Sequence, residues 1–428
     1  MSDNRSFVIT CNNEIVMKCK FVLYYYLVSV FLLANGAFSN YIFSMVHLNV
    51  WRQLIWFVGL FIVLKSTISK HSFRIRRLFN TTKKLFGWIL FCSFVTIAIY
   101  AFNPIRIIYA WWMYFSGIPF VLLPYVLRKN HWSENKINNL FVFFGLFQTI
   151  GLLVDYILGG LFTTMFASAG NDTENLLEAG RYCFMAEAPT TFGIYYSFCL
   201  LMTLKSVVCT KSNIKRLFLI IFSCTYIIAA WFTGSRQIVA ALAIVFVFGL
   251  VFIYKYDKQT RNVVVVMVLV VIAAIPSIYI KLTEDEVYAN RFDSETIKED
   301  TRSEKWHNGF VYCIKDMNPK RILMGEAIGL AMGQKAEHGE VVGSHYENSI
   351  WSRMSETGLI GLILLLYPVI YLMKGFNRHR LMDVLTLAFM ISYVMTCYVS
   401  PNGLNQTAQM SVYLALGMYI YNKDYDLS

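Results

Sequence analysis

Charged residues are scarce in this chain, and their scarcity indicates the class of protein. Asp, Glu, Lys and Arg together make up 15% of the 428 residues, whereas 57% of the residues are hydrophobic. Ordinary soluble domains carry roughly a quarter charged residues. Because the apolar residues gather in runs long enough to cross a bilayer as helices, the sequence predicts an all-α polytopic membrane protein.

Other features are missing as well, and each absence excludes a class of protein. Proline occurs only eight times, and no low-complexity tract or solenoid-length repeat is found. No CxxC pair or histidine cluster suggests a metal site, so neither a metal nor a cofactor is expected. The nine cysteines are scattered, and most are expected to be buried as small hydrophobic side chains. Cys183 and Cys313 share the predicted outer side and could pair, although spacing alone leaves this open.

Apolar runs of about 20 residues predict twelve transmembrane helices. The runs cover residues 21–38, 50–66, 86–102, 107–127, 139–160, 187–204, 214–233, 237–255, 262–280, 358–374, 381–399 and 406–421. The second is weakened by Trp51-Arg52-Gln53 at its start, and the last is short and begins with polar residues. We therefore expect helices 1–9 in residues 1–280, a long external loop in residues 281–357, and helices 10–12 with a cytoplasmic tail in residues 358–428.

The positions of lysine and arginine predict the orientation. If the N-terminus is cytoplasmic, the inner segments hold 24 of the 38 cations, the short outer loops hold four, and the long loop holds ten. Cytoplasmic loops carry the excess of cations, and long loops are largely exempt from this rule. Both termini are therefore predicted to be cytoplasmic. The net charge of +12 reflects this topology rather than a nucleic-acid site, since no basic polar domain with interleaved aromatics is present.

The long external loop is expected to contain helical structure of its own. It holds 14 acidic and ten basic residues. Trp306, Phe310, Val311 and Ile314 recur at helical spacing, which predicts a surface helix lying across the mouth of the bundle. The following stretch, from Asn318 to Gly329, is typical of a turn and a tight glycine-rich connection.

Two arginines lie in short outer loops from which cations are otherwise almost absent. Arg181 precedes the predicted sixth span, and Arg236 lies in the turn Thr233-Gly234-Ser235-Arg236-Gln237. A guanidinium pairs bidentately with anionic oxygens and stays charged, so both residues suit a diphosphate. The alternative is an arginine whose charged group merely extends to the membrane–water interface. Glu187, close to Pro189, is either a substrate-binding carboxylate or a favourable charge at a helix N-terminus.

The end of the long loop supplies a candidate catalytic carboxylate. On a helix, Glu347 would head an apolar stripe that faces the bundle, where it could act as a general base. The competing interpretation is a capping box, in which Ser344 caps the helix and Glu347 bonds back to the cap amide. His345 could itself be a base or a phosphate contact, although a lone loop histidine is usually neither.

Four elements together resemble the O-antigen ligase and O-antigen polymerase (Wzy) superfamily of polytopic bacterial glycosyltransferases. Their order, spacing and common external side carry the resemblance, which covers about residues 180–375. They are Arg181 with Glu187-Ala188-Pro189; Gly234-Ser235-Arg236; Arg302 to Trp306 with Pro319 and the Gly325/Gly329 turn; and Glu347-Asn348 with Glu356-Thr357-Gly358-Leu359-Ile360-Gly361.

The resemblance implies a GT-C-like fold and donor glycans linked to undecaprenyl diphosphate. It also implies transfer on the outer, periplasmic side of the bacterial inner membrane, without a nucleotide sugar or an obligatory metal. Ligases of this family look like His-Asn at the positions that Glu347-Asn348 occupy here. This departure favours a polymerase of lipid-linked repeat units, such as an O-antigen or a related surface polysaccharide.

A polymerase of this family implies a role for each candidate site residue. Arg181 and Arg236 would hold the diphosphate, Arg302 would complete the clamp, Glu347 would accept the proton from the acceptor hydroxyl, and Asn348 would orient the sugar. Glu187 and His345 are further candidate contacts. The expected partners are the lipid-linked glycans and membrane lipid, with a chain-length regulator as a candidate protein partner.

Two other functions stay open from the sequence. One is a ligase that transfers finished glycan to lipid A core or to a protein. The other is a flippase or transporter of lipid-linked oligosaccharides. It is disfavoured because Asp155 is the only acid well inside a predicted span and the two halves show no convincing repeat.

Overall fold

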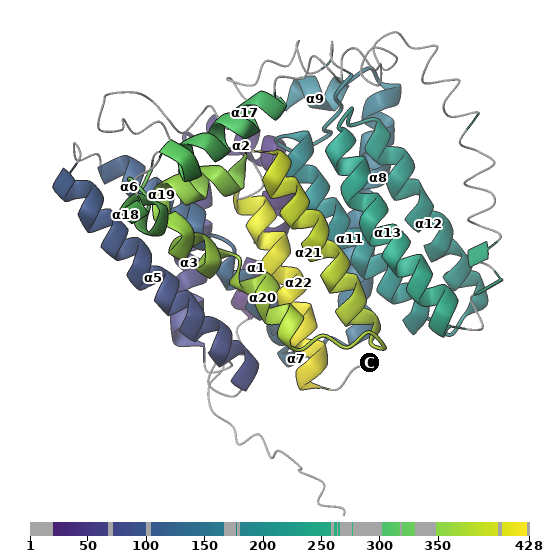
Figure 1. Ribbon diagram of the computed structural model, residues 1–428. Coiled ribbons are helices and arrows are strands. Elements are labelled where there is room, and N and C mark those ends of the chain that lie inside the picture. Colours follow the sequence, from purple (N-terminus) through teal and green to yellow (C-terminus); the bar gives the residue numbers. More distant parts are fainter. Residues whose placement is uncertain are drawn as a thin grey trace, which may run out of the picture.

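The computed structural model describes most of the chain. The described residues are 20–66, 72–99, 104–166, 177, 180–257, 261–262, 264–265, 276, 302–316, 319–329, 348–400 and 405–425. Within them the regular secondary structure is entirely helical, and the helices form one bundle (Figure 1). The predicted ninth span, 262–280, lies almost wholly outside these residues.

The chain begins its described part with a broken helix. α1 (Lys20–Ala34) and α2 (Gly36–Met45) are bent by 103° to each other at Asn35, so the predicted span 21–38 is not one straight helix. The Asn35 side chain donates to the Phe31 carbonyl oxygen at 2.8 Å and accepts from Gln148 Nε2 at 2.7 Å. These hydrogen bonds hold the polar break inside the protein, where water cannot satisfy it.

Seven helical segments are long and apolar enough to cross a membrane, and the bent pair α1–α2 would make an eighth. They are the run of α6 (Pro104–Phe115), η1 (Ile118–Leu122) and α7 (Leu123–Lys129); α8 (Glu134–Ile157); α11 (Pro189–Cys209); α12 (Asn213–Trp231); α13 (Arg236–Tyr256); α19 (Ser349–Leu365) with α20 (Tyr367–Lys374); and α21 (Leu381–Val399). The protein is therefore a multi-pass helical membrane protein.

Three further predicted spans form helices that are too short or too polar to be counted among the membrane-crossing segments. They are α3 (Trp51–Lys65), α5 (Phe73–Ile99) and α22 (Gln406–Asp424). α3 is only 15 residues long, and the first half of α5 is strongly basic. α22 is rich in polar and small residues. The predicted total of twelve spans stays a prediction.

α22 and α11 form the centre of the bundle. All residues of α22 from Gln406 to Asn422 are buried, and 89% of the span within α11 is buried, against 39% for α8 and α12. α22 packs against η1, α7, α11 and α21 (Figure 1). Because protein surrounds α22, its polar side chains find partners there rather than lipid, which explains how so polar a helix occupies the centre.

One end of the bundle carries several short helices. α17 (Arg302–Phe310) continues into the π-helical turn η2 (Val311–Asp316), which is followed by α18 (Pro319–Met324), and α9 (Leu161–Met165) lies at the same end (Figure 1). Trp306 of α17 packs on Tyr398 near the end of α21, with ring centroids 5.5 Å apart, and Phe310 packs on Trp351 of α19 at 5.8 Å. α17 thus lies across the helix ends, as the spacing of its aromatic residues predicts.

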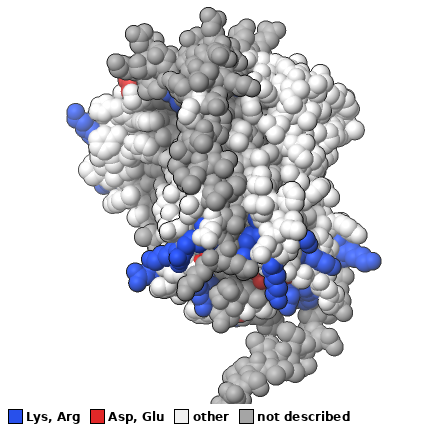
Figure 2. Space-filling model, turned by 90° about the vertical axis from the view of Figure 1, so that its right-hand side faces the viewer, with Lys and Arg blue, Asp and Glu red and all other residues white. Residues whose placement is uncertain are grey.

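The opposite end of the bundle is basic. Figure 2 shows lysine and arginine side chains gathered in a band at the lower end, with a largely uncharged surface above it. Ion pairs hold the end of α22 there, since Lys423 pairs with Asp383 at 3.0 Å and Asp424 pairs with Arg74 at 2.6 Å. We call this the basic end, and the end covered by α17 the mouth.

Candidate functional site

Arg181 and Arg236 lie on two segments that contact each other at the mouth. The Tyr182 amide donates to the Phe232 carbonyl oxygen at 3.0 Å, so the segment before α11 crosses the turn between α12 and α13. Tyr156 of α8 packs on both segments, with its ring centroid 5.2 Å from that of Tyr182 and 4.2 Å from that of Phe232. Gly234, at φ 57°, lets the turn close before α13 begins at Arg236. Both arginine side chains are half-buried.

A buried carboxylate fixes the segment that carries Arg181. Asp155 Oδ1 accepts from the Phe162 and Thr163 amides at 2.7 and 3.2 Å, and its Oδ2 accepts from Thr163 Oγ1 at 2.5 Å and the Phe184 amide at 3.1 Å. Phe184 has φ 53°, a conformation that non-glycine residues seldom adopt without such support. Asp155 therefore has a positioning role that local sequence patterns did not show.

The start of α19 meets the same group of helix ends. Ser349 donates from its amide and from its hydroxyl to the Ser400 carbonyl oxygen, at 3.2 and 2.7 Å, just beyond α21. Gln237, next to Arg236, donates to the Val399 carbonyl oxygen at 2.9 Å. The end of α21 therefore joins the start of α13 to the start of α19, which brings Arg236 and Asn348 to one edge of the bundle.

Asn348 caps α19, which corrects the predicted capping box. Its Oδ1 accepts from the amides of Ile350 and Trp351 at 2.9 and 3.1 Å, and the helix begins at Ser349. Ser344 is therefore not the cap of this helix, and Glu347 precedes the cap instead of following it. The Nδ2 group of Asn348 is buried and has no hydrogen-bond acceptor among the described residues. The predicted helix opening at Glu347 and the predicted span start at residue 358 are both displaced to Ser349.

Three predicted site residues cannot be placed by their side chains. Glu347 and His345 lie outside the described residues, although Glu347 directly precedes Asn348 in the chain. Arg302 is the first residue of α17, so its backbone lies at the mouth, but its side chain is not among those described.

Glu187 forms an ion pair that local sequence did not predict. Its Oε2 lies 2.7 Å from Arg52 Nη2 of α3, and its Oε1 accepts from Asn40 Nδ2 of α2 at 3.4 Å. α11 begins only at Pro189, with Ala188 as its cap. The Glu187 carboxylate thus binds side chains from α2 and α3, which gives it a role beyond that of a charge near a helix start. Its partner is 135 residues away in sequence, beyond the reach of any local pattern.

A buried ion pair lies within α19. Arg353 Nη1 lies 2.5 Å from Glu356 Oε2, which also accepts from the Tyr114 hydroxyl at 2.6 Å. The Arg353 guanidinium stacks over the Tyr114 ring at 4.8 Å, and the two charged side chains are 5% and 0% exposed. The i,i+3 spacing of Arg353 and Glu356 on an apolar helix was a signal for this pair. The hydrogen bond from Tyr114 anchors α19 to α6. Because the charges of Arg353 and Glu356 neutralise each other, the pair offers no net charge to an anionic substrate.

Two glycines allow residues 323–326, at and after the end of α18, to contact the backbone of α19 closely. Gly358 has φ 65° and ψ −173° inside α19, and Gly325 has φ 79°. A β-carbon on either residue would meet backbone atoms of the other segment, and the Glu326 amide donates to the Ser355 carbonyl oxygen at 2.7 Å. The stretch 318–329 was predicted as a turn and a glycine-rich connection, and this is wrong for its first part, where Pro319–Met324 form the helix α18. The part from Gly325 onward makes a backbone-to-backbone contact with α19 at the point where α19 bends.

The described cysteines and metal-binding residue types add no further site. Cys183 and Cys313 are both free and buried, so they do not form a disulfide in this structure. In the part of the chain that the structure describes, no three His, Cys, Asp or Glu side chains lie together as metal ligands would.

The comparisons with known proteins give no independent identification. No family model matches the chain, and no curated protein is significantly similar to it.

Proposed function

We propose that the protein is a glycosyltransferase that polymerises oligosaccharide repeat units linked to undecaprenyl diphosphate, for an O-antigen or a related surface polysaccharide. The observation that carries the proposal is the meeting of the Arg181 segment, the Arg236 turn and the Asn348 cap at the mouth. A GT-C-like fold with about twelve spans and a site on the periplasmic side of the bacterial inner membrane belong to the same proposal.

The distribution of cations supports the sidedness. The basic end of the bundle matches the cytoplasmic side expected from the positive-inside rule (Figure 2). Arg181 and Arg236 lie at the other end, in short outer loops that together hold only four of the 38 cations. In the proposal the mouth faces the periplasm and both termini are cytoplasmic.

Two arginines suit the leaving group of this reaction. As the anomeric carbon leaves the diphosphate, negative charge develops on the diphosphate oxygens, and guanidinium groups held at the mouth would stabilise it. Arg181 and Arg236 are both half-buried, so their charges act in a medium less polar than bulk water. Arg302 is proposed to add a third cation from α17.

The acceptor side of the reaction is assigned to the start of α19. In the proposal, Glu347 takes the proton from the acceptor hydroxyl. At the same time the oxygen of that hydroxyl bonds to the anomeric carbon of the donor, and the bond from this carbon to the diphosphate breaks. The growing chain on its lipid is the donor, and the free undecaprenyl diphosphate is released. Asn348 is proposed to orient the sugar through Nδ2, because its Oδ1 is already occupied by the helix amides. Direct displacement predicts inversion at the anomeric carbon.

An ion-coupled transporter fits the buried acid less well. Asp155 accepts four hydrogen bonds from α9 and the segment before α11. A carboxylate so fully occupied holds backbone in place, whereas an acid that carries protons or ions through a membrane must exchange its partners.

The first experiment is to extract and size the lipid-linked glycans from cells that lack the protein. A pool arrested at one repeat unit on the outer face supports a polymerase. Long lipid-linked chains that never reach their acceptor would indicate a ligase, and single units trapped on the cytoplasmic face would indicate a flippase. Either of these outcomes would overturn the proposal.

The second experiment tests the residues by complementation in the same cells. Arg236→Ala should lower polymerisation about 10²–10³-fold if Arg236 stabilises the leaving charge, by analogy with a lost oxyanion donor. Arg378→Ala is the matched control, because it removes an exposed arginine from the basic end. Glu347→Gln should give folded but inactive protein, whereas Glu304→Gln, an exposed carboxylate on α17, should retain activity. Normal activity of Glu347→Gln would remove the general base from the mechanism.

A further inference from the structure

A second polar cluster lies at the mouth beside the arginine segments. It joins Glu187 to Arg52 at 2.7 Å and to Asn40 at 3.4 Å, and Asn40 Oδ1 accepts from Trp51 Nε1 at 3.1 Å. Tyr109 of α6 is close enough to share an electrostatic interaction with Arg52 and Glu187. Four separate stretches of the chain therefore build one cluster, from α2, α3, α6 and the segment before α11.

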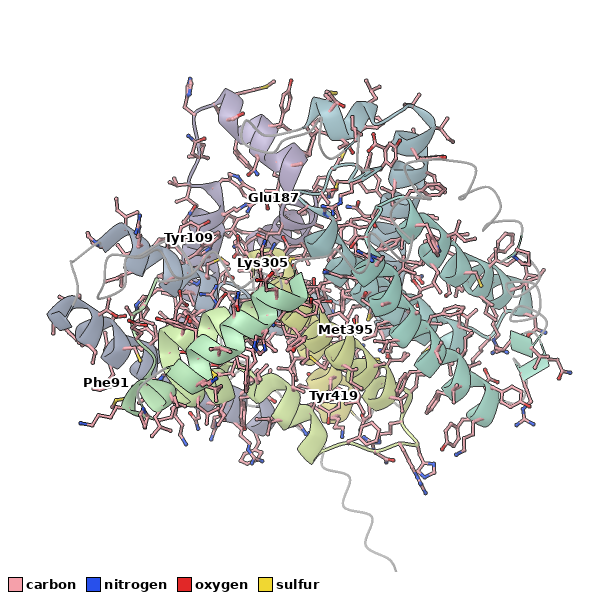
Figure 3. All side chains as sticks on the ribbon, turned by 45° about the horizontal axis from the view of Figure 1, so that its top comes forward. Phe91, Tyr109, Glu187, Lys305, Met395 and Tyr419 are labelled. Atoms are coloured by element: carbon pink, nitrogen blue, oxygen red, sulfur yellow. The ribbon has the colours of Figure 1, made fainter. Side chains whose placement is uncertain are left out.

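The cluster is open to a ligand. The Glu187 side chain is 31% exposed, that of Arg52 18%, and Tyr109 is 39% exposed. In Figure 3, Glu187 and Tyr109 lie in the upper part of the view, with Lys305 of α17 drawn below them. By contrast, the pair Arg353–Glu356 is closed off, because its side chains are 5% and 0% exposed.

The chemistry of the cluster differs from that of the arginine segments. Arg52 and Glu187 cancel each other in charge, and the carboxylate would repel a diphosphate. Together the members offer strong donors in the guanidinium and amide, strong acceptors in the carboxylate, and the partly exposed aromatic ring of Tyr109. A neutral sugar presents the complement of these groups, namely hydroxyls that both donate and accept and a face of carbon-bound hydrogens.

The distance to the arginine segments suits one extended substrate. Glu187 and Arg181 are six residues apart, so their backbones lie within about 20 Å of each other even if the segment is fully extended. The segment begins against the Arg236 turn, through the Tyr182 amide, and ends against α2 and α3, through Glu187. A glycan attached to a diphosphate can bridge the two places.

We propose that Asn40, Arg52, Glu187 and Tyr109 form a binding subsite for a neutral sugar of the lipid-linked substrate, next to the diphosphate site. This proposal rests on the proposed function. It assigns Glu187 to the sugar rather than to the diphosphate, and it adds three residues that the sequence did not single out.

The test measures binding of two probes to the purified full chain in lipid nanodiscs. One probe is the glycan released by mild acid from the lipid-linked pool, and the other is undecaprenyl diphosphate. Glu187→Gln and Asn40→Ala should each weaken glycan binding at least tenfold and leave undecaprenyl diphosphate binding unchanged. Arg236→Ala should show the reverse pattern. Asn135→Ala, an exposed asparagine at the start of α8, is the matched control.

A charge-swapped double variant separates a sugar contact from a structural ion pair. Arg52→Glu combined with Glu187→Arg can keep the salt bridge, and with it the fold, but it reverses the positions of donors and acceptors. We expect this variant to fold and to bind glycan at least tenfold more weakly. Wild-type glycan affinity in the double variant, or in Glu187→Gln, would overturn the subsite.

The outcomes also distinguish this proposal from the polymerase. If cells lacking the protein keep a normal lipid-linked pool while the variants lose glycan binding, the polymerase fails and the subsite stands. If the pool collapses to single units while the variants bind glycan normally, the subsite fails and the polymerase stands.

Discussion

Replacing Gly358 with alanine should destabilise the protein strongly, because this glycine fails to tolerate a side chain for two separate reasons. Its φ of 65° and ψ of −173° lie in a region that is essentially restricted to glycine, and such strain costs about 1–3 kcal/mol. In addition, a β-carbon would lie 2.5 Å from the Gly325 amide nitrogen and closer still to the Leu323 carbonyl group. Backbone atoms cannot rotate away, so overpacking adds about 1–3 kcal/mol.

The expected loss is therefore about 2–6 kcal/mol in the free energy of unfolding. The measurement is an SDS titration of the full chain in bicelles, followed by circular dichroism. Gly87→Ala is the matched control, since Gly87 lies on the exposed side of α5 with no atom within 4 Å of an added β-carbon. Alanine is the better helix former there by about 0.5–1 kcal/mol, so the control should be neutral or slightly stabilised. Equal stability of the two variants would refute the backbone contact between α18 and α19.

Three further predictions concern buried groups. Asp155→Asn should place an amide donor against the Phe184 amide and so speed hydrogen exchange of the Phe184 amide about tenfold or more. Exchange in α21 should stay unchanged. An unaltered exchange rate at Phe184 would contradict the positioning role of Asp155. Arg353→Met and Glu356→Gln should each lower the free energy of unfolding by about 3–5 kcal/mol. The double variant should lose less than the sum, and strict additivity in a denaturation series would argue against the ion pair. Burial raises the pKa of the Cys313 thiol to about 12, so it should stay protonated and unlabelled by maleimide at pH 7.5, while the exposed Cys209 reacts; peptide mapping that finds Cys313 labelled in native protein would contradict its burial.

Hydrophobic runs allowed much of the helical framework to be predicted. The predicted run 381–399 coincides with α21, because Arg380 and Ser400 bound a mostly apolar stretch whose one charged residue, Asp383, lies in the first turn. The predicted run 21–38 did not reveal the break at Asn35, since that break depends on a hydrogen bond to Gln148 of another helix. A hydropathy pattern reports which residues avoid water, but it does not report which helix supplies a partner.

The candidate site could be predicted only where its residues lie close in sequence to a helix end. Arg236 and Asn348 stand at such ends, and the alternation of inner and outer loops placed them on one side. The ion pair of Glu187 with Arg52 could not be found this way, because 135 residues separate the partners and only the packing of α2 and α3 brings them together. The i,i+3 spacing of Arg353 and Glu356 was visible in the sequence, but the hydrogen bond from Tyr114 to Glu356 depends on how α6 packs against α19.

The central position of α22 has a consequence for the biogenesis of the protein. Ribosomes deliver helices to the membrane in chain order, and α22 is made after every other described helix. The earlier helices must therefore enter the bilayer and wait with their inner faces uncovered, since residues Gln406–Asn422 later fill the space between them. The bundle cannot close until this comparatively polar helix inserts. A chain halted before this helix would expose the inner faces of η1, α7, α11 and α21 that α22 otherwise covers.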